Sequence, residues 1–138
     1  FELAQESYNY NEVPVGAIIV NNGKIIGRGR NNVITNNDVT SHAEINAIKD
    51  ASKNIQNYRL VNCQMYVTLE PCHMCAKAIV DSRLKSVIFS TLEPKTGCII
   101  SIDNFLDARH LNHRVEYEYG LMQKESTDLL KSFFEKRR

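Results

Sequence analysis

The sequence predicts an α/β fold, a sandwich in which helices pack on a β-sheet. Short apolar runs of strand length alternate along the chain with longer segments of helical periodicity, an order typical of this class. The chain has 138 residues, of which 43% are hydrophobic. This length supports one good core and is short for two ordinary domains. We therefore expect residues 1–138 to form a single domain whose functional side chains lie at the strand ends.

A helix and a β-hairpin are predicted for the N-terminal part of the chain. Residues 1–8 carry apolar side chains at helical spacing, and the apolar run 17–20 has the length of a buried strand. Asn22-Gly23 is a strong hairpin signal between that run and residues 24–29. We expect the first two strands to be antiparallel neighbours.

A longer helix is predicted after a polar stretch. Residues 31–40 are mostly polar and are expected to be irregular. Apolar residues at helical spacing follow His42, and Thr40 or Ser41 offers a hydroxyl that can cap a helix start. The helix should therefore begin near His42.

The second half of the chain repeats the order of strand and helix. Residues 65–69 are predicted to be a strand, and Pro71 suits the first turn of a helix over 72–82. Residues 86–89 should form the next strand, and 96–112 a loop with a short helix. The remaining elements are a strand over 115–119 and an amphipathic helix over 121–135.

Composition gives no sign of a membrane span and no general affinity for RNA. No run of about eighteen apolar residues is present, and the chain does not open on a basic region followed by an apolar core. The formal net charge is +1, so any nucleic-acid surface must come from local clustering. Judged by charge alone, the best cluster of cations is more often a solvated helix end than an RNA contact. That cluster comprises Lys131, Lys136, Arg137 and Arg138.

Two short motifs carry the candidate chemistry. The sequence has HAE at 42–44 and PCHMC at 71–75. An imidazole and two thiolates favour zinc, so we expect His42, Cys72 and Cys75 to be metal ligands at two helix starts. Three protein ligands leave the fourth position for water, as in hydrolytic zinc sites. A redox pair or a structural zinc knuckle would not explain the His-x-Glu motif at a helix start.

Glu44 is the candidate proton shuttle. Zinc lowers the pKa of a bound water towards neutrality, and a carboxylate beside it can pass protons to a leaving group. Glu70 could compete for this role. It lies at a strand-to-helix corner, where a carboxylate serves as a helix-start charge, so we interpret Glu70 as structural.

The other cysteines and histidines have simpler explanations. Cys63 could close the zinc site as a fourth ligand, which would make the protein a zinc-stabilised binding module, but its place before a strand favours the core. Cys98 is interpreted in the same way. His73, His110 and His113 are expected to be surface or hydrogen-bonding residues rather than zinc ligands. Reduced cysteines fit a cytoplasmic protein.

The combination of HxE and PCxxC resembles the signature of the zinc-dependent nucleoside and nucleobase deaminases. Segments 13–17, 66–72, 112–115 and 129–138 closely resemble the bacterial tRNA adenosine deaminases, so the resemblance covers nearly the whole chain. It implies a three-layer, cytidine-deaminase-like sandwich with a five-stranded mixed sheet flanked by helices. It also implies one zinc ion per subunit, a homodimer, and hydrolytic deamination of the wobble adenosine in a tRNA anticodon loop to inosine, with release of ammonia.

The same resemblance implies substrate contacts. Asn31 matches the asparagine that hydrogen-bonds the target nucleoside, and Val15 and Leu69 match positions in the pocket wall. Phe134 and Arg138, on the final helix, are candidates for contact with the RNA.

Two positions depart from the family pattern. Arg30 stands where a tryptophan or another large residue is common, and Glu93 stands where an aspartate is usual. Both bear on recognition of the nucleotides around the target base. A free nucleobase or nucleoside deaminase, of guanine or cytidine type, would share the zinc and the glutamate. The segment 112–115 and the Phe-Phe-x-x-Arg-Arg ending favour the tRNA enzyme.

Overall fold

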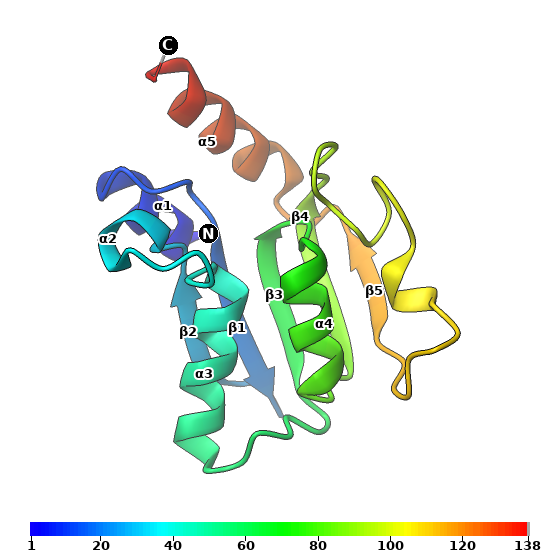
Figure 1. The fold of residues 1–138 in the computed structure, drawn as a ribbon. Coiled ribbons are helices and arrows are strands. Elements are labelled where there is room, and N and C mark those ends of the chain that lie inside the picture. Colours follow the sequence, from blue (N-terminus) through cyan, green and yellow to red (C-terminus); the bar gives the residue numbers. More distant parts are fainter. Residues whose placement is uncertain (138) are drawn as a thin grey trace.

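The computed structural model describes residues 1–137, which form a five-stranded mixed sheet with helices on both faces (Figure 1). The strand order is β2-β1-β3-β4-β5. β1 is antiparallel to β2 and β3, whereas β3, β4 and β5 are parallel. The predicted α/β sandwich is confirmed. The elements are α1 (Glu2–Asn9), β1 (Gly16–Asn21), β2 (Lys24–Arg30), α2 (Val33–Asn36), α3 (Ala43–Ile55), β3 (Gln64–Leu69), α4 (His73–Asp81), β4 (Ser86–Thr91), the 3-10 helix η1 (Phe105–Asp107), β5 (Glu116–Tyr119) and α5 (Gln123–Glu135).

The predicted hairpin joins β1 to β2. Asn22 and Gly23 both have positive φ angles, 51° and 76°. A two-residue type I′ turn requires this conformation, which asparagine and glycine adopt at low cost. The turn brings β2 back antiparallel to β1 and pairs Asn21 with Lys24.

α3 and α4 lie next to each other on one face of the sheet, and α1 and α5 lie on the other (Figure 1). α3 approaches β2 very closely. A Cβ atom at Gly29 would lie 2.3 Å from the backbone oxygen of Ala43, so only glycine permits this contact. The contact fixes the first turn of α3 against the sheet, which is the turn that carries the HxE motif.

The core lies mainly between the sheet and the α3–α4 layer. Apolar side chains from the strands meet small side chains of α3 and larger ones of α4, and every residue of β4 is buried. No helix within residues 1–137 is both long and apolar enough to cross a membrane. The largest fully buried apolar side chains include Phe89, Ile19, Leu60, Met65, Ile79 and Leu84.

The start of α3 differs from the prediction. Its N-cap residue is His42, and no side-chain cap hydrogen bond is made there. Thr40 and Ser41 do not cap the helix, because their hydroxyls have other partners. Thr40 donates to Asp38 at 2.7 Å, and Ser41 accepts from Asn46 at 3.1 Å.

The start of α4 also differs. Cys72 is the N-cap residue, in an extended conformation, and the helix begins at His73. Pro71 therefore precedes the helix instead of lying in its first turn. Both motif helices thus begin with a zinc-ligand candidate at the N-cap.

Two further predictions needed correction. The stretch 31–40, expected to be irregular, contains the single-turn helix α2. The last helix begins at Gln123 rather than at residue 121. Leu121 and Met122 lie outside it, and Met122 has a positive φ of 55°.

Candidate active site

The two motifs meet in space at the N-termini of α3 and α4. The Nδ1 atom of His42 lies 3.4 Å from Sγ of Cys75 and 3.7 Å from Sγ of Cys72. One ligand atom from each residue lies within 4.8 Å of the others. A tetrahedral zinc ion would place nitrogen and sulfur ligands about 3.5 Å apart. The donor set and its spacing therefore fit zinc.

Local helix geometry places the sulfur atoms. Cys72 is the N-cap of α4 and Cys75 lies in its first turn, so both side chains are close to free backbone N–H groups. The partial positive charge of a helix start favours a thiolate over a thiol. His42 at the start of α3 completes the group.

The electrostatics of the two cysteines differ. A hydrogen bond from the Cys75 thiol lowers the pKa of Cys72 to about 4, with His42 contributing in the same direction. The same bond, together with burial, raises the pKa of Cys75. Cys72, through its hydrogen bond, raises the pKa of His42. One thiolate, the form that binds a metal, is thus already favoured at neutral pH.

Glu44 lies in the first turn of α3, two residues after His42, and is only 5% exposed. Burial raises the pKa of its carboxyl group to about 7. A group with this pKa can both accept and donate a proton near neutral pH, as a general acid and base must.

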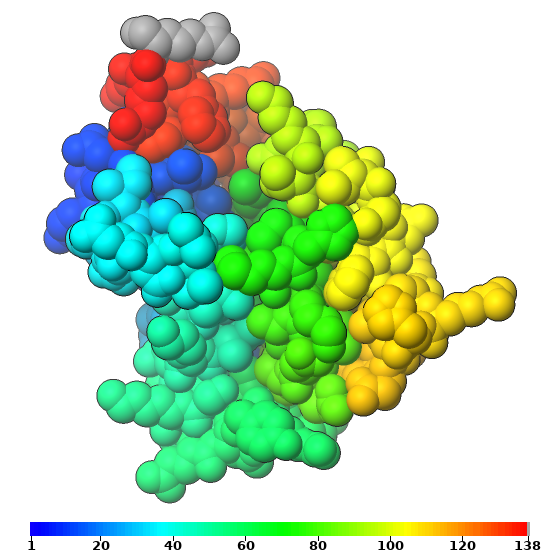
Figure 2. All heavy atoms as spheres, in the orientation of Figure 1, coloured from blue at the N-terminus to red at the C-terminus, as the bar shows by residue number. Residues whose placement is uncertain are grey.

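A cavity of ≈ 370 Å³ opens beside these residues. Figure 2 shows the surface hollowed between α5, the α2 segment and the loop that follows β4. This cavity, called the active-site cavity below, brings together most of the side chains that the sequence singled out. Its lining includes His42, Glu44, Cys72, Val15, Asn31, Leu69, Glu93 and Phe134.

Asn31 is held in one orientation. Its side-chain Nδ2 donates to the backbone oxygen of Val13 at 3.1 Å, and its own backbone oxygen accepts from the hydroxyl of Ser7 at 2.9 Å. The residue is 8% exposed. The amide oxygen Oδ1 is therefore the atom that can accept a hydrogen bond from a molecule in the active-site cavity.

Glu12, which sequence reasoning missed, shapes the cavity wall. This carboxylate is 1% exposed and accepts hydrogen bonds from the backbone N–H groups of Ile34 and Thr35, at 3.1 and 2.7 Å, and from the Thr35 hydroxyl at 2.7 Å. Burial pushes the pKa of Glu12 upward, but these hydrogen bonds outweigh it and lower the pKa. The sequence feature that could have identified Glu12 is a charged residue directly before the apolar segment 13–20.

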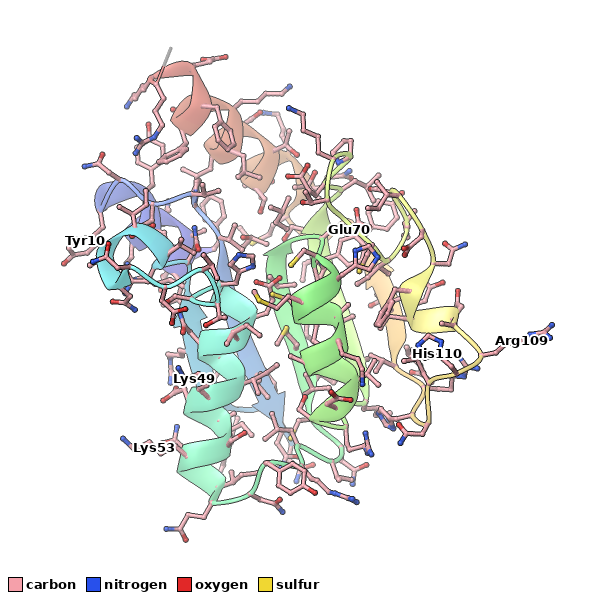
Figure 3. The ribbon with its side chains drawn as sticks, viewed as in Figure 1. Tyr10, Lys49, Lys53, Glu70, Arg109 and His110 are labelled. Atoms are coloured by element: carbon pink, nitrogen blue, oxygen red, sulfur yellow. The ribbon has the colours of Figure 1, made fainter. Side chains whose placement is uncertain are left out.

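Glu70 anchors the loop that follows β4, which agrees with its structural interpretation. Its carboxylate accepts from the backbone N–H groups of Glu93, Ile99, Ile100 and Ser101, at 2.8 to 3.0 Å, and from the Ser101 hydroxyl. Figure 3 shows Glu70 where this loop meets the end of β3 and the start of α4.

Other candidates lie outside the metal group. Cys63 is part of the buried core, and its Sγ contacts the backbone oxygen of Val61 at 3.5 Å. Within residues 1–137 it does not join His42, Cys72 and Cys75 as a fourth ligand. His113 contacts the backbone oxygen of Leu84 at 2.8 Å, as expected for a hydrogen-bonding residue.

Arg30 is not among the residues that line the active-site cavity. Its guanidinium lies 4.6 Å from the centre of the Tyr10 ring, and its Nε lies 3.7 Å from the Glu6 carboxylate. Glu93, the other departure from the family pattern, does line the active-site cavity.

The C-terminal candidates have different positions. Phe134 is 49% exposed at the edge of the active-site cavity. Arg138 lies outside the described residues. Arg137 donates to the backbone oxygen of Asn11 at 2.8 Å, and its guanidinium lies 4.1 Å from the centre of the Phe133 ring. Arg137 thus ties α5 to the turn after α1.

Comparison with known proteins gives consistent matches. The sequence model of the MafB19-like deaminase family matches residues 1–138. The chain is 47% identical to the tRNA-specific adenosine deaminase of Haemophilus influenzae, over 99% of this chain and 80% of that protein. It is also 47% identical to the tRNA-specific adenosine deaminase of Aquifex aeolicus, over 98% of this chain and 89% of that protein.

The fold is also similar to a solved structure. That structure comes from studies of A-to-I editing by tRNA:A34 deaminases at the wobble position of transfer RNA, and it matches with a TM-score of 0.91 and 36% identity, over 94% of both chains. The sequence similarity, the fold and the His-Cys-Cys group beside a buried glutamate agree. The chain therefore belongs to the MafB19-like deaminases and, among them, to the tRNA-specific adenosine deaminases.

Proposed function

We propose that this chain is a zinc-dependent hydrolase that deaminates the wobble adenosine of a tRNA anticodon loop to inosine and releases ammonia. The observation that carries this proposal is the meeting of His42, Cys72 and Cys75 beside the buried carboxyl group of Glu44, at one cavity. Membership of the tRNA-specific adenosine deaminases supports the choice of substrate.

The roles of the site residues follow from their chemistry. His42, Cys72 and Cys75 would hold one zinc ion, which, when bound, makes a water molecule acidic enough to react near neutral pH. Glu44 would accept a proton from that water and pass it to the adenine ring nitrogen next to C6, and it would then take the proton that remains on the added oxygen and give it to the departing amine. The raised pKa of Glu44, about 7, suits both directions of transfer.

The substrate base would enter the active-site cavity after leaving the stack of the anticodon loop. Asn31 offers its amide oxygen to an N–H or O–H group of the nucleoside, while Val15 and Leu69 contact the base from the sides. Phe134 lies at the edge, where an exposed ring can stack on an unpaired base. Arg138 is proposed to contact the RNA backbone.

Three broader proposals rest on the family resemblance. Residues 1–138 form one zinc-dependent deaminase domain, the enzyme acts as a homodimer, and it works in the cytoplasm, where the thiol ligands stay reduced. Light scattering during size-exclusion chromatography tests the dimer, and a mass of one chain would contradict it.

The decisive experiment compares substrates for the zinc-loaded protein. An anticodon stem-loop with adenosine at the wobble position is incubated beside free adenosine, adenine, guanine and cytidine, and inosine and ammonia are measured. We expect inosine in the stem-loop and no turnover of the free compounds. A stem-loop with guanosine at the same position serves as the matched control. Turnover of a free base or nucleoside instead would overturn the tRNA substrate and retain the zinc chemistry.

A further inference from the structure

A second group of metal-ligand side chains lies at the start of α4, which begins at His73. The Nε2 atom of His73 lies 2.6 Å from Oδ2 of Asp103, and Sγ of Cys98 completes a set whose atoms all lie within 4.8 Å of one another. His73 and Asp103 are each about half exposed, at 50% and 46% of their side chains, whereas Cys98 is fully buried beneath them. The imidazole and the carboxylate of this group are thus open to solvent, whereas its sulfur atom is buried.

The backbone around this group is held firmly. The N–H of Cys98 donates to the oxygen of Pro71 at 3.0 Å, and the oxygen of Cys98 accepts from the N–H of Phe105 at 2.9 Å. The next three residues, 99–101, donate their N–H groups to the buried carboxylate of Glu70. These contacts join the loop to the start of α4, so the three donor atoms are brought together by the backbone. A ligand set needs this kind of support to bind a metal tightly.

We propose that His73, Cys98 and Asp103 form a second binding site for a zinc-like divalent transition metal, separate from the site at His42, Cys72 and Cys75. One imidazole, one thiolate and one carboxylate suit zinc or cobalt and are unsuited to magnesium, which requires oxygen ligands. Water would complete the coordination on the exposed side. The His73–Asp103 pair would open by less than about 1 Å to admit a metal, because zinc ligands lie about 3.4 Å apart, and both side chains have solvent beside them.

The proposed site would bind more weakly than the first. Cys98 has its pKa raised to about 12, chiefly by burial, so the metal must displace a tightly held proton. Binding would fasten residues 97–105 to α4. Because Thr96 and Glu93, on the same loop, line the active-site cavity, the metal would also stiffen one wall of that cavity.

The test is a metal titration of the whole protein purified with its resident zinc. Cobalt(II) is added, its binding is followed by the absorption band of a thiolate–cobalt bond, and bound metal is counted by mass spectrometry after dialysis. We expect the wild type to bind one more equivalent of metal than Asp103→Asn or His73→Gln, whose affinity for the added metal should fall at least about tenfold. Magnesium should give no band and no competition.

The matched control is His110→Gln. His110, labelled in Figure 3, packs against the Phe105 ring as His73 does, with ring centroids 6.3 Å and 5.7 Å apart respectively, and does not belong to the ligand group. The His110→Gln variant should bind cobalt like the wild type. Because the test rests on the difference between wild type and variant, it is independent of occupancy at the first site. Equal metal content in wild type, Asp103→Asn and His73→Gln, with all of them folded by circular dichroism, would overturn the proposal.

Discussion

Glu44 is the side chain on which turnover should depend most. Glu44→Gln keeps the size of the side chain and removes its ability to exchange a proton. We expect zinc content to stay at the wild-type level, while the single-turnover rate of inosine formation falls on the order of a hundredfold or more. Mass spectrometry for zinc and a quenched time course on the stem-loop measure the two effects. A near-normal rate would remove Glu44 from the mechanism.

Asn31 should determine how well the nucleoside is held. Asn31→Asp replaces the amide that donates to the Val13 oxygen with a carboxylate, which that oxygen repels. The side chain then no longer has a fixed orientation in the active-site cavity. The loss of a buried hydrogen bond costs about 1 to 3 kcal/mol, so kcat/KM on the stem-loop should fall about ten- to a hundredfold.

The control for this change is Asn54→Asp. Asn54 makes the same kind of bond, from its Nδ2 to the backbone oxygen of Ile26 at 2.8 Å, at an exposed position on α3. The kcat/KM of the Asn54→Asp variant should match that of the wild type. Equal losses in both variants would mean that the Asn31 effect is one of general stability.

At the scale of an element, helix α2 should depend on Glu12. A single helical turn is too short to be stable by itself, and Glu12 supplies acceptors for the N–H groups at its start. Glu12→Gln replaces one carboxylate oxygen with an NH2 group that faces donors. We expect it to lower the free energy of unfolding by about 1 to 3 kcal/mol and to raise KM for the stem-loop, since Ile34 of α2 lines the active-site cavity.

The pH dependence of this effect has a definite sign. The pKa of Glu12 in the folded protein lies below its ordinary value of 4.5, because its hydrogen bonds outweigh the effect of burial. Its contribution is therefore present above about pH 4.5 and is lost as pH falls through the folded-state pKa. Urea unfolding at several pH values should show the difference between wild type and Glu12→Gln shrinking below pH 4.5.

Asp38→Asn is the control for the Glu12 series. Asp38 also accepts from a backbone N–H and a hydroxyl, both of Thr40, but these bonds are exposed. Asp38→Asn should lower the free energy of unfolding much less than Glu12→Gln does. If the difference in unfolding free energy between wild type and Glu12→Gln stays constant or grows at acidic pH, the proposed coupling of stability to the ionisation of Glu12 is wrong.

At the scale of the whole molecule, a net charge of +1 means that RNA affinity depends on where the cations lie. A groove of ≈ 520 Å³ adjoins the active-site cavity and shares Leu69, Glu93 and Phe134 with it. Lys131 of α5 is exposed in this groove, whereas Arg137 is engaged with Asn11 and Lys136 lies 5.0 Å from the centre of the Tyr8 ring. Lys131 is therefore the described C-terminal cation best placed for a phosphate.

We expect Lys131→Gln to weaken binding of the stem-loop and to reduce the slope of log affinity against log salt by about 0.7 to 0.9, the value for one phosphate contact. Fluorescence anisotropy at several salt concentrations measures both. Lys53→Gln is the matched control, because Lys53 lies towards the far end of α3, away from the active-site cavity (Figure 3). Equal slopes for the wild type and Lys131→Gln would place α5 outside the RNA interface.

Local patterns were sufficient to predict much of this protein. The alternation of apolar runs gave the α/β class, Asn22-Gly23 gave the hairpin, and the two motifs gave the three ligand candidates that the structure brings within 4.8 Å. These features can be predicted from the sequence because each depends on the spacing of residues within a few positions of one another.

The tertiary structure alone decided the contacts between distant segments. Glu12 holds Thr35, 23 residues away, Glu70 holds Ser101, 31 residues away, and His73 meets Asp103, 30 residues away. No periodicity or propensity reports such pairs, since a buried carboxylate and an exposed one look the same in a sequence. The sequence by itself determined the chemistry available to the site. Packing of the loops onto the strand ends decided which carboxylates hold the walls of the cavity and which can move protons.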